Sequence, residues 1–219
     1  MVASKEDNGV VPGPDAPLLA SALRKQPAQR RSMERVALIL DAAGDLVAKQ
    51  GYVGITTSLI ARHAGVPPGT LYEFFIDKRA VMQAVAARNL ERFDDRVSRV
   101  LDSHPPRDFR EAARLILDIY IEMNRRDVRF RAVRFGDVVE PHLFDPEIEN
   151  DALVAARYAA LLSRIAEVKD TPELHRSLVF AAKMVDVLID YAFSIDEDGD
   201  PWVLDRTRLL VDEHLSRVD

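Results

Sequence analysis

The stretch that decides the fold runs from Thr56 to Phe75 and reads TTSLIARHAGVPPGTLYEFF. Its apolar residues recur at helical spacing on both sides of Gly65, which predicts two short helices joined by a tight turn. Glycine suits the positive φ at which a helix ends. Pro68 suits the first turn of the next helix, where a missing N–H costs nothing. Two such helices form the unit that places a helix in the DNA major groove.

The same spacing divides the side chains of the two helices into an inner and an outer set. Thr57 stands where a residue caps the first helix. The residues expected to be buried are Leu59, Ile60, Ala64, Leu71, Phe74 and Phe75. Thr70, Tyr72 and Glu73 are left for the outer side of the second helix, and they are therefore candidates for contact with DNA.

The composition is that of a globular chain, with 219 residues, 47% apolar residues and a net charge of −6. This length fits one large or two small domains. No apolar run approaches the roughly 20 residues of a membrane span, and the N-terminus lacks the pattern of a secretory signal. Because the chain has no cysteine, it cannot form disulfides or thiolate metal sites. We therefore expect a cytoplasmic protein without a membrane partner.

The charge is unevenly distributed along the chain. Residues 24–80 hold nine Lys or Arg against five Asp or Glu, whereas residues 81–219 hold 20 against 28. Positive charge confined to the helix-turn-helix segment predicts a local contact with phosphates. We divide the chain into a disordered tail (1–23), a basic arm with a DNA-binding domain (24–80), and a helical regulatory and dimerisation domain (81–219).

The segment Arg24–Arg31, the basic arm, can be interpreted in two ways. It is either a solvated flank or an arm that touches phosphates or the minor groove. Because it lies immediately before the DNA-binding unit, we favour the second interpretation and count Arg30 and Arg31 as candidate DNA contacts.

Helical periodicity continues through the rest of the chain, and we find no strand signal. The sequence therefore predicts an all-α fold. The helices expected outside the motif span about 33–50, 78–102, 108–125, 147–168, 172–194 and 202–217, with a short helix in 127–139.

The helix expected at 172–194 carries two apolar stripes, which indicates burial on more than one side. We expect the second side to meet another copy of the chain and the protein to be a homodimer. The candidate interface residues on this helix and the last one are Phe180, Met184, Val187, Tyr191, Val211 and Leu215.

The motif and the helix before it resemble the TetR family of bacterial transcriptional repressors. The resemblance covers about residues 33–80 without a gap. It rests on Ile39-Leu40-Asp41-Ala42-Ala43, Gly51-Tyr52, Thr56-Thr57, Ile60-Ala61, Ala64-Gly65-Val66, Gly69-Thr70-Leu71-Tyr72, Phe75 and Lys78. It implies an N-terminal three-helix DNA-binding domain and a larger helical domain for ligand binding and dimerisation.

The resemblance also implies roles for single residues. Thr57 occupies a position that often meets a phosphate, and Thr70 that of a groove-facing threonine. Tyr72 and Lys78 look like the phosphate-binding tyrosine and lysine of the family, although Lys78 can also be read as a solvated lysine. Gly69 and Ser58 complete the candidate interface.

The chain departs from the family pattern at three positions. Pro68 replaces a basic residue found in many members, and Ser58 stands where some members place an arginine that reads guanine. Glu73 can accept from a cytosine amino group, or it can be solvated or paired with an arginine. We therefore expect phosphates, the basic arm and DNA shape to contribute more than direct reading of bases.

The sequence contains no motif of a hydrolase nucleophile, a zinc protease, a dinucleotide fold or a phosphate loop. We therefore predict no enzyme, no catalytic residue, no cofactor and no metal site. The histidines are scattered, and the run 196–200 is interpreted as a solvated acidic loop. The arginine-rich run 125–134 is either an ion-paired face or a site for an anion.

The sequence thus predicts a transcriptional regulator, a repressor of a palindromic operator in double-stranded DNA that is released by a small-molecule effector. Activation of transcription is an alternative, because an activator and a repressor make the same DNA contacts and differ only in the position of the operator. The aromatic and methionine residues Tyr120, Met123, Phe135 and Tyr158 are candidates for an apolar effector pocket, or else they are core. The alternative function is that of a helical homodimeric interaction protein with a vestigial helix-turn-helix.

Overall fold

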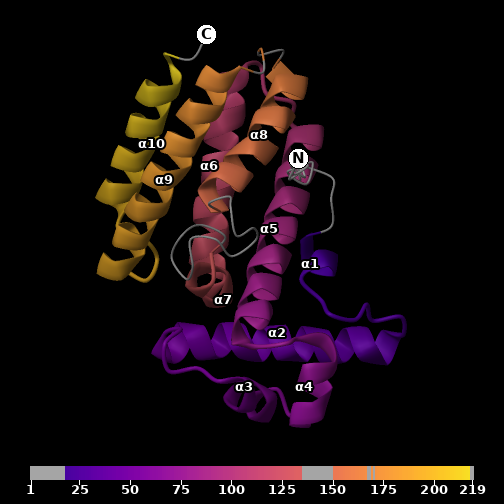
Figure 1. Ribbon diagram of the computed structural model, residues 1–219. Helices are drawn as coiled ribbons and strands as arrows, with labels where there is room; N and C mark the ends of the chain where they lie inside the picture. Colours follow the sequence, from indigo (N-terminus) through magenta and orange to yellow (C-terminus); the bar gives the residue numbers. More distant parts are fainter. Residues whose placement is uncertain (1–17, 135–149, 167–168, 170, 218–219) are drawn as a thin grey trace, which may run out of the picture.

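The computed structural model describes residues 18–134, 150–166, 169 and 171–217, which form ten α-helices and no strand. The helices are α1 (Leu18–Ser21), α2 (Arg30–Gln50), α3 (Thr57–His63), α4 (Pro68–Phe74), α5 (Lys78–Ser103), α6 (Phe109–Arg126), α7 (Val128–Ala132), α8 (Asn150–Ala166), α9 (Pro172–Ile195) and α10 (Pro201–Leu215). Helices α2, α3 and α4 lie at one end of the molecule, and α6, α8, α9 and α10 lie together at the other (Figure 1). The predicted all-α fold is confirmed.

Local signals explain where the long helices begin and end. The side chain of Asp77 accepts a hydrogen bond from the Ala80 N–H at 2.8 Å and begins α5. The side chain of Asp200 accepts a hydrogen bond from the Val203 N–H at 2.9 Å and begins α10. Gly51 ends α2 with a φ of 73°. The ends of α2, α5, α6, α9 and α10 fall within three residues of the predicted ones, whereas the ends predicted at 147 and 168 lie outside the described residues.

The cap of α3 corrects one prediction. Thr56, not Thr57, is the capping residue, and its hydroxyl accepts from the Leu59 N–H at 3.2 Å. The physical reason is the backbone: Thr56 is extended, with φ −129° and ψ 156°, whereas Thr57 already belongs to the helix.

The N-terminal boundaries differ from the prediction as well. Residues 18–21, expected in a disordered tail, form α1, and Leu18 is buried. The Leu19 N–H donates to Glu91 of α5 at 2.9 Å. The apolar side chains here cover the core, which offsets the entropy of ordering the segment. Residues 1–17 lie outside the described residues.

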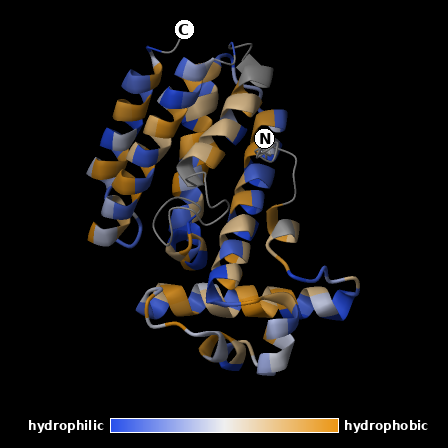
Figure 2. Ribbon diagram, in the orientation of Figure 1, coloured by the Kyte–Doolittle hydropathy of each residue, from blue (hydrophilic) through white to orange (hydrophobic). Residues whose placement is uncertain are grey.

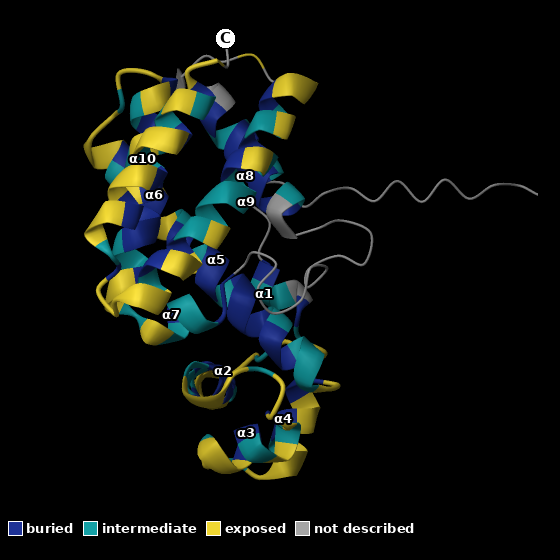
Figure 3. Cartoon of the chain, turned by 90° about the vertical axis from the view of Figure 1, so that its left-hand side faces the viewer, coloured by how far each residue is buried: buried dark blue, intermediate teal, exposed yellow. Residues whose placement is uncertain are grey.

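Two hydrophobic cores lie along α5, one in each part of the molecule (Figure 3). Val81, Met82 and Val85, in the first half of α5, pack with α2, α3 and α4. Leu90 and Phe93, farther along, pack with α6, α8 and α9. One continuous helix therefore belongs to both cores, and apolar residues follow it at helical intervals (Figure 2).

Candidate nucleic-acid interface and ligand cavity

The helix-turn-helix has the geometry that its sequence predicts. Gly65 takes a φ of 66° at the turn, and Pro68 begins α4. Ile60 and Leu71 are buried on the inner sides of α3 and α4, together with Phe74 and Phe75. The inner set is thus confirmed, apart from Leu59 and Ala64, which are half-buried.

The outer set lies on the side of α3 and α4 turned away from the rest of the molecule (Figure 3). We call it the recognition face. It consists of the exposed residues Ser58, Gly69, Tyr72 and Glu73 with the half-exposed Thr57 and Thr70. A Cβ added at Gly69 would meet no atom within 4 Å, so this point of α4 is open to close approach.

Tyr72 is tied to α3 through its hydroxyl. The Tyr72 Oη and Thr57 Oγ1 lie 2.8 Å apart, so the two residues that the resemblance assigns to phosphates share a hydrogen bond. The sequence places these residues 15 positions apart, and only the packing of α3 against α4 brings them together.

Lys78 is held at the first turn of α5. Its Nζ donates to the Tyr52 carbonyl at 3.3 Å and lies 4.0 Å from the centre of the Tyr52 ring. The ammonium group therefore has a fixed position beside the loop between α2 and α3, and it is not simply a solvated lysine.

The basic arm is divided by the start of α2. Arg30 and Arg31 are in the first turn of this helix, where Arg30 pairs with Glu34 at 2.9 Å. Arg24 and Lys25 precede it and are exposed. The Arg24 N–H donates to the Phe74 carbonyl at 2.9 Å, which fixes the arm beside the end of α4.

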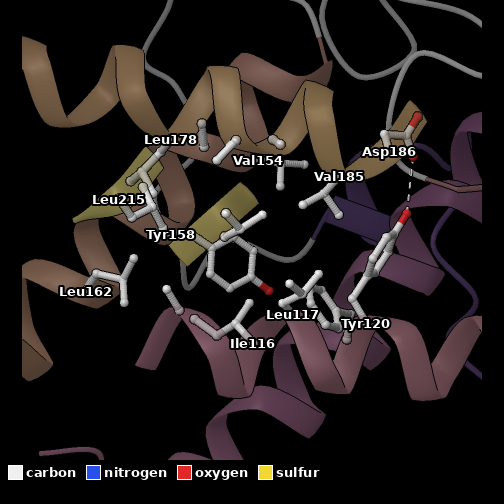
Figure 4. A pocket seen from close by; sticks show the side chains of 16 residues that line it. Ile116, Leu117, Tyr120, Val154, Tyr158, Leu162, Leu178, Val185, Asp186 and Leu215 are labelled. Atoms are coloured by element: carbon white, nitrogen blue, oxygen red, sulfur yellow. Dashed lines mark hydrogen bonds between the residues drawn. The ribbon is translucent and has the colours of Figure 1, made fainter. Parts of the chain in front are cut away.

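An apolar cavity of about 130 Å³ lies among the helices of the other part (Figure 4). Helices α5, α6, α8, α9 and α10 all contribute to its wall, with Phe93 coming from α5. Two of the predicted pocket residues, Tyr120 and Tyr158, line the cavity. Met123 does not line it and packs against the core instead. Phe135 lies outside the described residues.

Each of the two cavity tyrosines donates to a carboxylate. Tyr120 donates to Asp186 of α9 at 3.3 Å, and Tyr158 donates to Asp94 of α5 at 2.8 Å. Burial, reinforced by the carboxylates, raises the pKa of both tyrosines well above the ordinary value. Both hydroxyls are therefore protonated at neutral pH.

A buried arginine stands beside each of these carboxylates. Arg134 lies 3.3 Å from Asp186 and 2.9 Å from Asp190, and its side chain is 1% exposed. Arg157 pairs with Asp94. Burial raises the pKa of Asp94, and the arginine opposes that rise. Periodicity could not predict these pairs, because their partners come from distant parts of the sequence. The two aspartates inside the apolar 178–192 stretch, Asp186 and Asp190, were a signal for the pairs of Arg134.

Part of the predicted dimer surface is exposed and part is not. Phe180, Val187 and Tyr191 of α9 are more than half exposed, and Met184 is half-buried. Val211 and Leu215 are a correction: they are buried within the protomer and line the cavity. On α10, three further large apolar residues that were not predicted are exposed, namely Trp202, Leu209 and Leu210.

The arginine-rich run 125–134 is mainly an ion-paired face, as one of its two interpretations expects. Arg126 pairs with Glu122 at 2.7 Å, and Arg129 pairs with Asp45 of α2 at 2.7 Å. Arg131 donates to the carbonyl of Glu197 at 2.9 Å. These contacts bind the α6–α7 corner to α2 and to the loop before α10.

No group of His, Asp and Glu side chains in the described part of the chain is arranged to hold a metal ion. His142 lies outside that part. None of the described helices is long and apolar enough to cross a membrane.

Two parts of the chain match known protein families. Residues 39–85 match the family described as bacterial regulatory proteins, tetR family, and residues 107–218 match the tetracyclin repressor-like C-terminal domain. A TetR-family transcriptional regulator from Streptomyces coelicolor has a similar structure, with a TM-score of 0.73 and 33% identity over 84% of this chain and 99% of that one. The fatty acid degradation regulator FadR from Bacillus halodurans, 18% identical with a TM-score of 0.62, shares the fold over 86% of this chain and 96% of its own.

Curated relatives match over shorter stretches. The transcriptional repressor KstR of Rhodococcus jostii is 36% identical over 110 residues, which is 48% of this chain and 50% of KstR. The regulator UidR of Escherichia coli is 35% identical over 54 residues, 25% of this chain and 28% of UidR. The match thus spans about half the length of the first of these relatives. With its helix-turn-helix and its helical C-terminal domain both matched, the chain belongs to the tetR family of bacterial regulatory proteins.

Proposed function

We propose that this protein is a transcriptional repressor that binds a palindromic operator as a homodimer and leaves it when a small molecule fills the cavity. The observation that carries the proposal is the path of α5. This helix belongs to the core beneath the recognition face at one end, and it contributes Phe93 to the cavity wall farther along. A change at the cavity therefore has a rigid connection to the DNA-binding end.

The recognition face and the basic arm are the proposed DNA contacts. Thr70 and Glu73 would enter the groove with Ser58 and Gly69. Phosphate contacts would come from a further set, namely Thr57, Tyr72, Lys78, Arg24, Lys25, Arg30 and Arg31. The exposure of the face, the fixed ammonium of Lys78 and the attachment of the arm to α4 support this assignment. The proposed site of action is the bacterial cytoplasm, where the operator lies.

A second contact supports coupling between the two parts. Val133 is buried in the DNA-binding core, and its carbonyl accepts from Asn89 at 2.8 Å. The next residue, Arg134, reaches Asp186 on the cavity wall. A ligand that moves Asp186 would thereby displace the segment packed against α2. A thousandfold preference of the ligand for the released state would offset about 4 kcal/mol of operator affinity.

The direct test is fluorescence anisotropy with the DNA upstream of the protein's own gene, in the presence of scrambled competitor. Tight binding that resists the competitor supports the proposal. The Tyr72→Phe variant should bind the operator about tenfold more weakly, because it lacks a hydroxyl that donates to a phosphate. Binding without sequence preference, unchanged in this variant, would favour an interaction protein with a vestigial motif.

The basic arm should account for part of the salt dependence of operator binding. In the double variant Arg24→Ala/Lys25→Ala, the slope of log affinity against log salt concentration should become shallower by about 2, since two phosphate contacts are lost. The matched control is Arg96→Ala/Arg99→Ala on the exposed side of α5 in the other part of the molecule, which removes the same charge. Equal slopes for the two variants would show that the arm makes no phosphate contact.

The proposed dimer forms through the outer sides of α9 and α10. Both helices carry exposed apolar side chains there, and apolar patches of this kind mark association surfaces. The residues are Phe180, Val187, Tyr191, Trp202, Leu209 and Leu210. A two-fold axis would place the recognition helices about 34–36 Å apart, one turn of DNA.

Val187→Asp should convert the dimer to a monomer at micromolar concentration. Each protomer of a symmetric dimer contributes one substituted residue, so the interface would bury two unpaired carboxylates. Sedimentation velocity measures the result. Val128→Asp on α7 places the same change on an exposed valine elsewhere. A dimer that persists unchanged in Val187→Asp would exclude this surface.

A further inference from the structure

Among the described residues that line the cavity, three have polar side-chain atoms, and all of these atoms are oxygens. Apart from Asp186, Tyr120 and Tyr158, the described side chains that line the cavity are hydrocarbon (Figure 4). A ligand that fills this space therefore makes apolar contacts over most of its surface, and its polar recognition is concentrated at these three residues.

The hydroxyl protons of both tyrosines are already committed. Tyr120 donates its proton to Asp186, and Tyr158 donates its proton to Asp94. A tyrosine has a single O–H donor. Neither hydroxyl therefore has a proton left to donate to a ligand, and the carboxylate of Asp186 has none either.

Two buried arginines near the cavity each contact a carboxylate: Arg157 pairs with Asp94, and Arg134 lies beside Asp186. Arg134 is 1% exposed and contacts Asp186, but it does not line the cavity. It offsets the charge of Asp186 from a position outside the cavity lining. A ligand anion would meet the Asp186 oxygens before it could reach the guanidinium group.

We propose that the effector is a neutral or cationic, mainly apolar molecule that carries a hydrogen-bond donor, such as a hydroxyl or amino group, directed at Asp186, and that the cavity rejects carboxylates. The word effector rests on the proposed function, because it implies that binding releases the operator. The preference of the cavity for one class of ligand does not depend on that function. A cavity of about 130 Å³ accommodates roughly one ring, since engineered apolar cavities near 150 Å³ bind benzene.

Three probes built on the same methyl-substituted ring test the preference in the full chain: toluene, 4-methylphenol and 4-methylbenzoate. Their dissociation constants are measured by calorimetry without DNA. We expect 4-methylphenol to bind about tenfold more tightly than toluene, because it donates to a charged acceptor. We expect 4-methylbenzoate to bind more weakly than toluene, because its carboxylate is desolvated against Asp186.

A double variant assigns the preference to Asp186. Arg134→Met/Asp186→Leu replaces the buried pair with apolar side chains of similar size, which proteins often tolerate. In this variant the advantage of 4-methylphenol over toluene should fall to within twofold. Arg126→Met/Glu122→Leu, which removes an exposed pair on α6, is the control and should keep the wild-type order.

The outcomes separate this inference from the proposed function. The expected order of affinities supports the inference whether or not a probe releases the protein from the operator. If the probes bind in that order but do not release the protein, the result counts against the proposed function alone. The inference is overturned if 4-methylbenzoate binds best, if toluene equals 4-methylphenol, if the double variant keeps the preference, or if no probe binds at millimolar concentration.

Discussion

Arg134→Met should lower the free energy of unfolding by about 3–5 kcal/mol, as expected when one partner of a buried ion pair is removed. The side chain of Arg134 is 1% exposed and that of Asp186 is 13% exposed. Without the guanidinium, the Asp186 carboxylate loses its contact with Arg134 inside a mainly apolar wall. Asp190, which is 68% exposed, would lose its partner at little cost because water replaces it.

Urea unfolding at fixed protein concentration measures this loss, since dimerisation makes stability depend on concentration. Arg176→Met on α9 is the control: it breaks an exposed pair with Glu173 and should change stability by less than about 0.5 kcal/mol. The double variant Arg134→Met/Asp186→Leu should recover most of the loss. A single variant as stable as the control would mean that the pair contributes nothing to the fold.

Gly69→Glu should abolish operator binding while the fold keeps its stability. A Cβ at this position meets no atom within 4 Å, and Gly69 lies in the first turn of α4. Replacing a helical glycine removes a backbone entropy cost of about 0.5–1 kcal/mol. The new carboxylate would project from the recognition face toward phosphates. Like charges brought together cost several kcal/mol, so we expect at least about 100-fold weaker binding.

Ser98→Glu is the matched control for the added charge. Ser98 is exposed on α5, 20 residues beyond Lys78, or about 30 Å along the helix. That distance exceeds the screening length of roughly 8 Å at physiological salt, so operator affinity should stay unchanged. Anisotropy gives the affinities, and thermal unfolding shows whether each variant is folded. If Gly69→Glu bound the operator normally, the recognition face would not be the DNA interface.

Local rules explain why the DNA-binding domain could be predicted from its sequence. Gly65 and Pro68 act on the backbone of their own turn, and their effect does not depend on distant residues. Helical periodicity likewise separates buried Leu71 from exposed Tyr72. The error at Thr57 is of the same local kind: two adjacent threonines can both cap a helix, and only the φ and ψ of Thr56 decide between them.

The boundaries of burial were harder to predict, because an apolar stripe does not reveal what covers it. Val211 and Phe180 both belong to apolar stripes of the last two helices. Val211 is nevertheless buried in the cavity wall of its own protomer, whereas Phe180 is 58% exposed. The angle at which α10 packs on α9 makes this distinction, and that angle depends on side chains from both helices.

The amino-acid pattern alone was sufficient for the all-α class, the helix-turn-helix and the long α5, because caps, turns and periodicity act between neighbours along the chain. The cavity and its two Tyr–Asp–Arg clusters exist only in the folded protein. Tyr120 meets Asp186, and Tyr158 meets Asp94, across more than 60 positions of sequence. Such meetings depend on how α5, α6, α8 and α9 pack together, and packing is a property of all these helices at once.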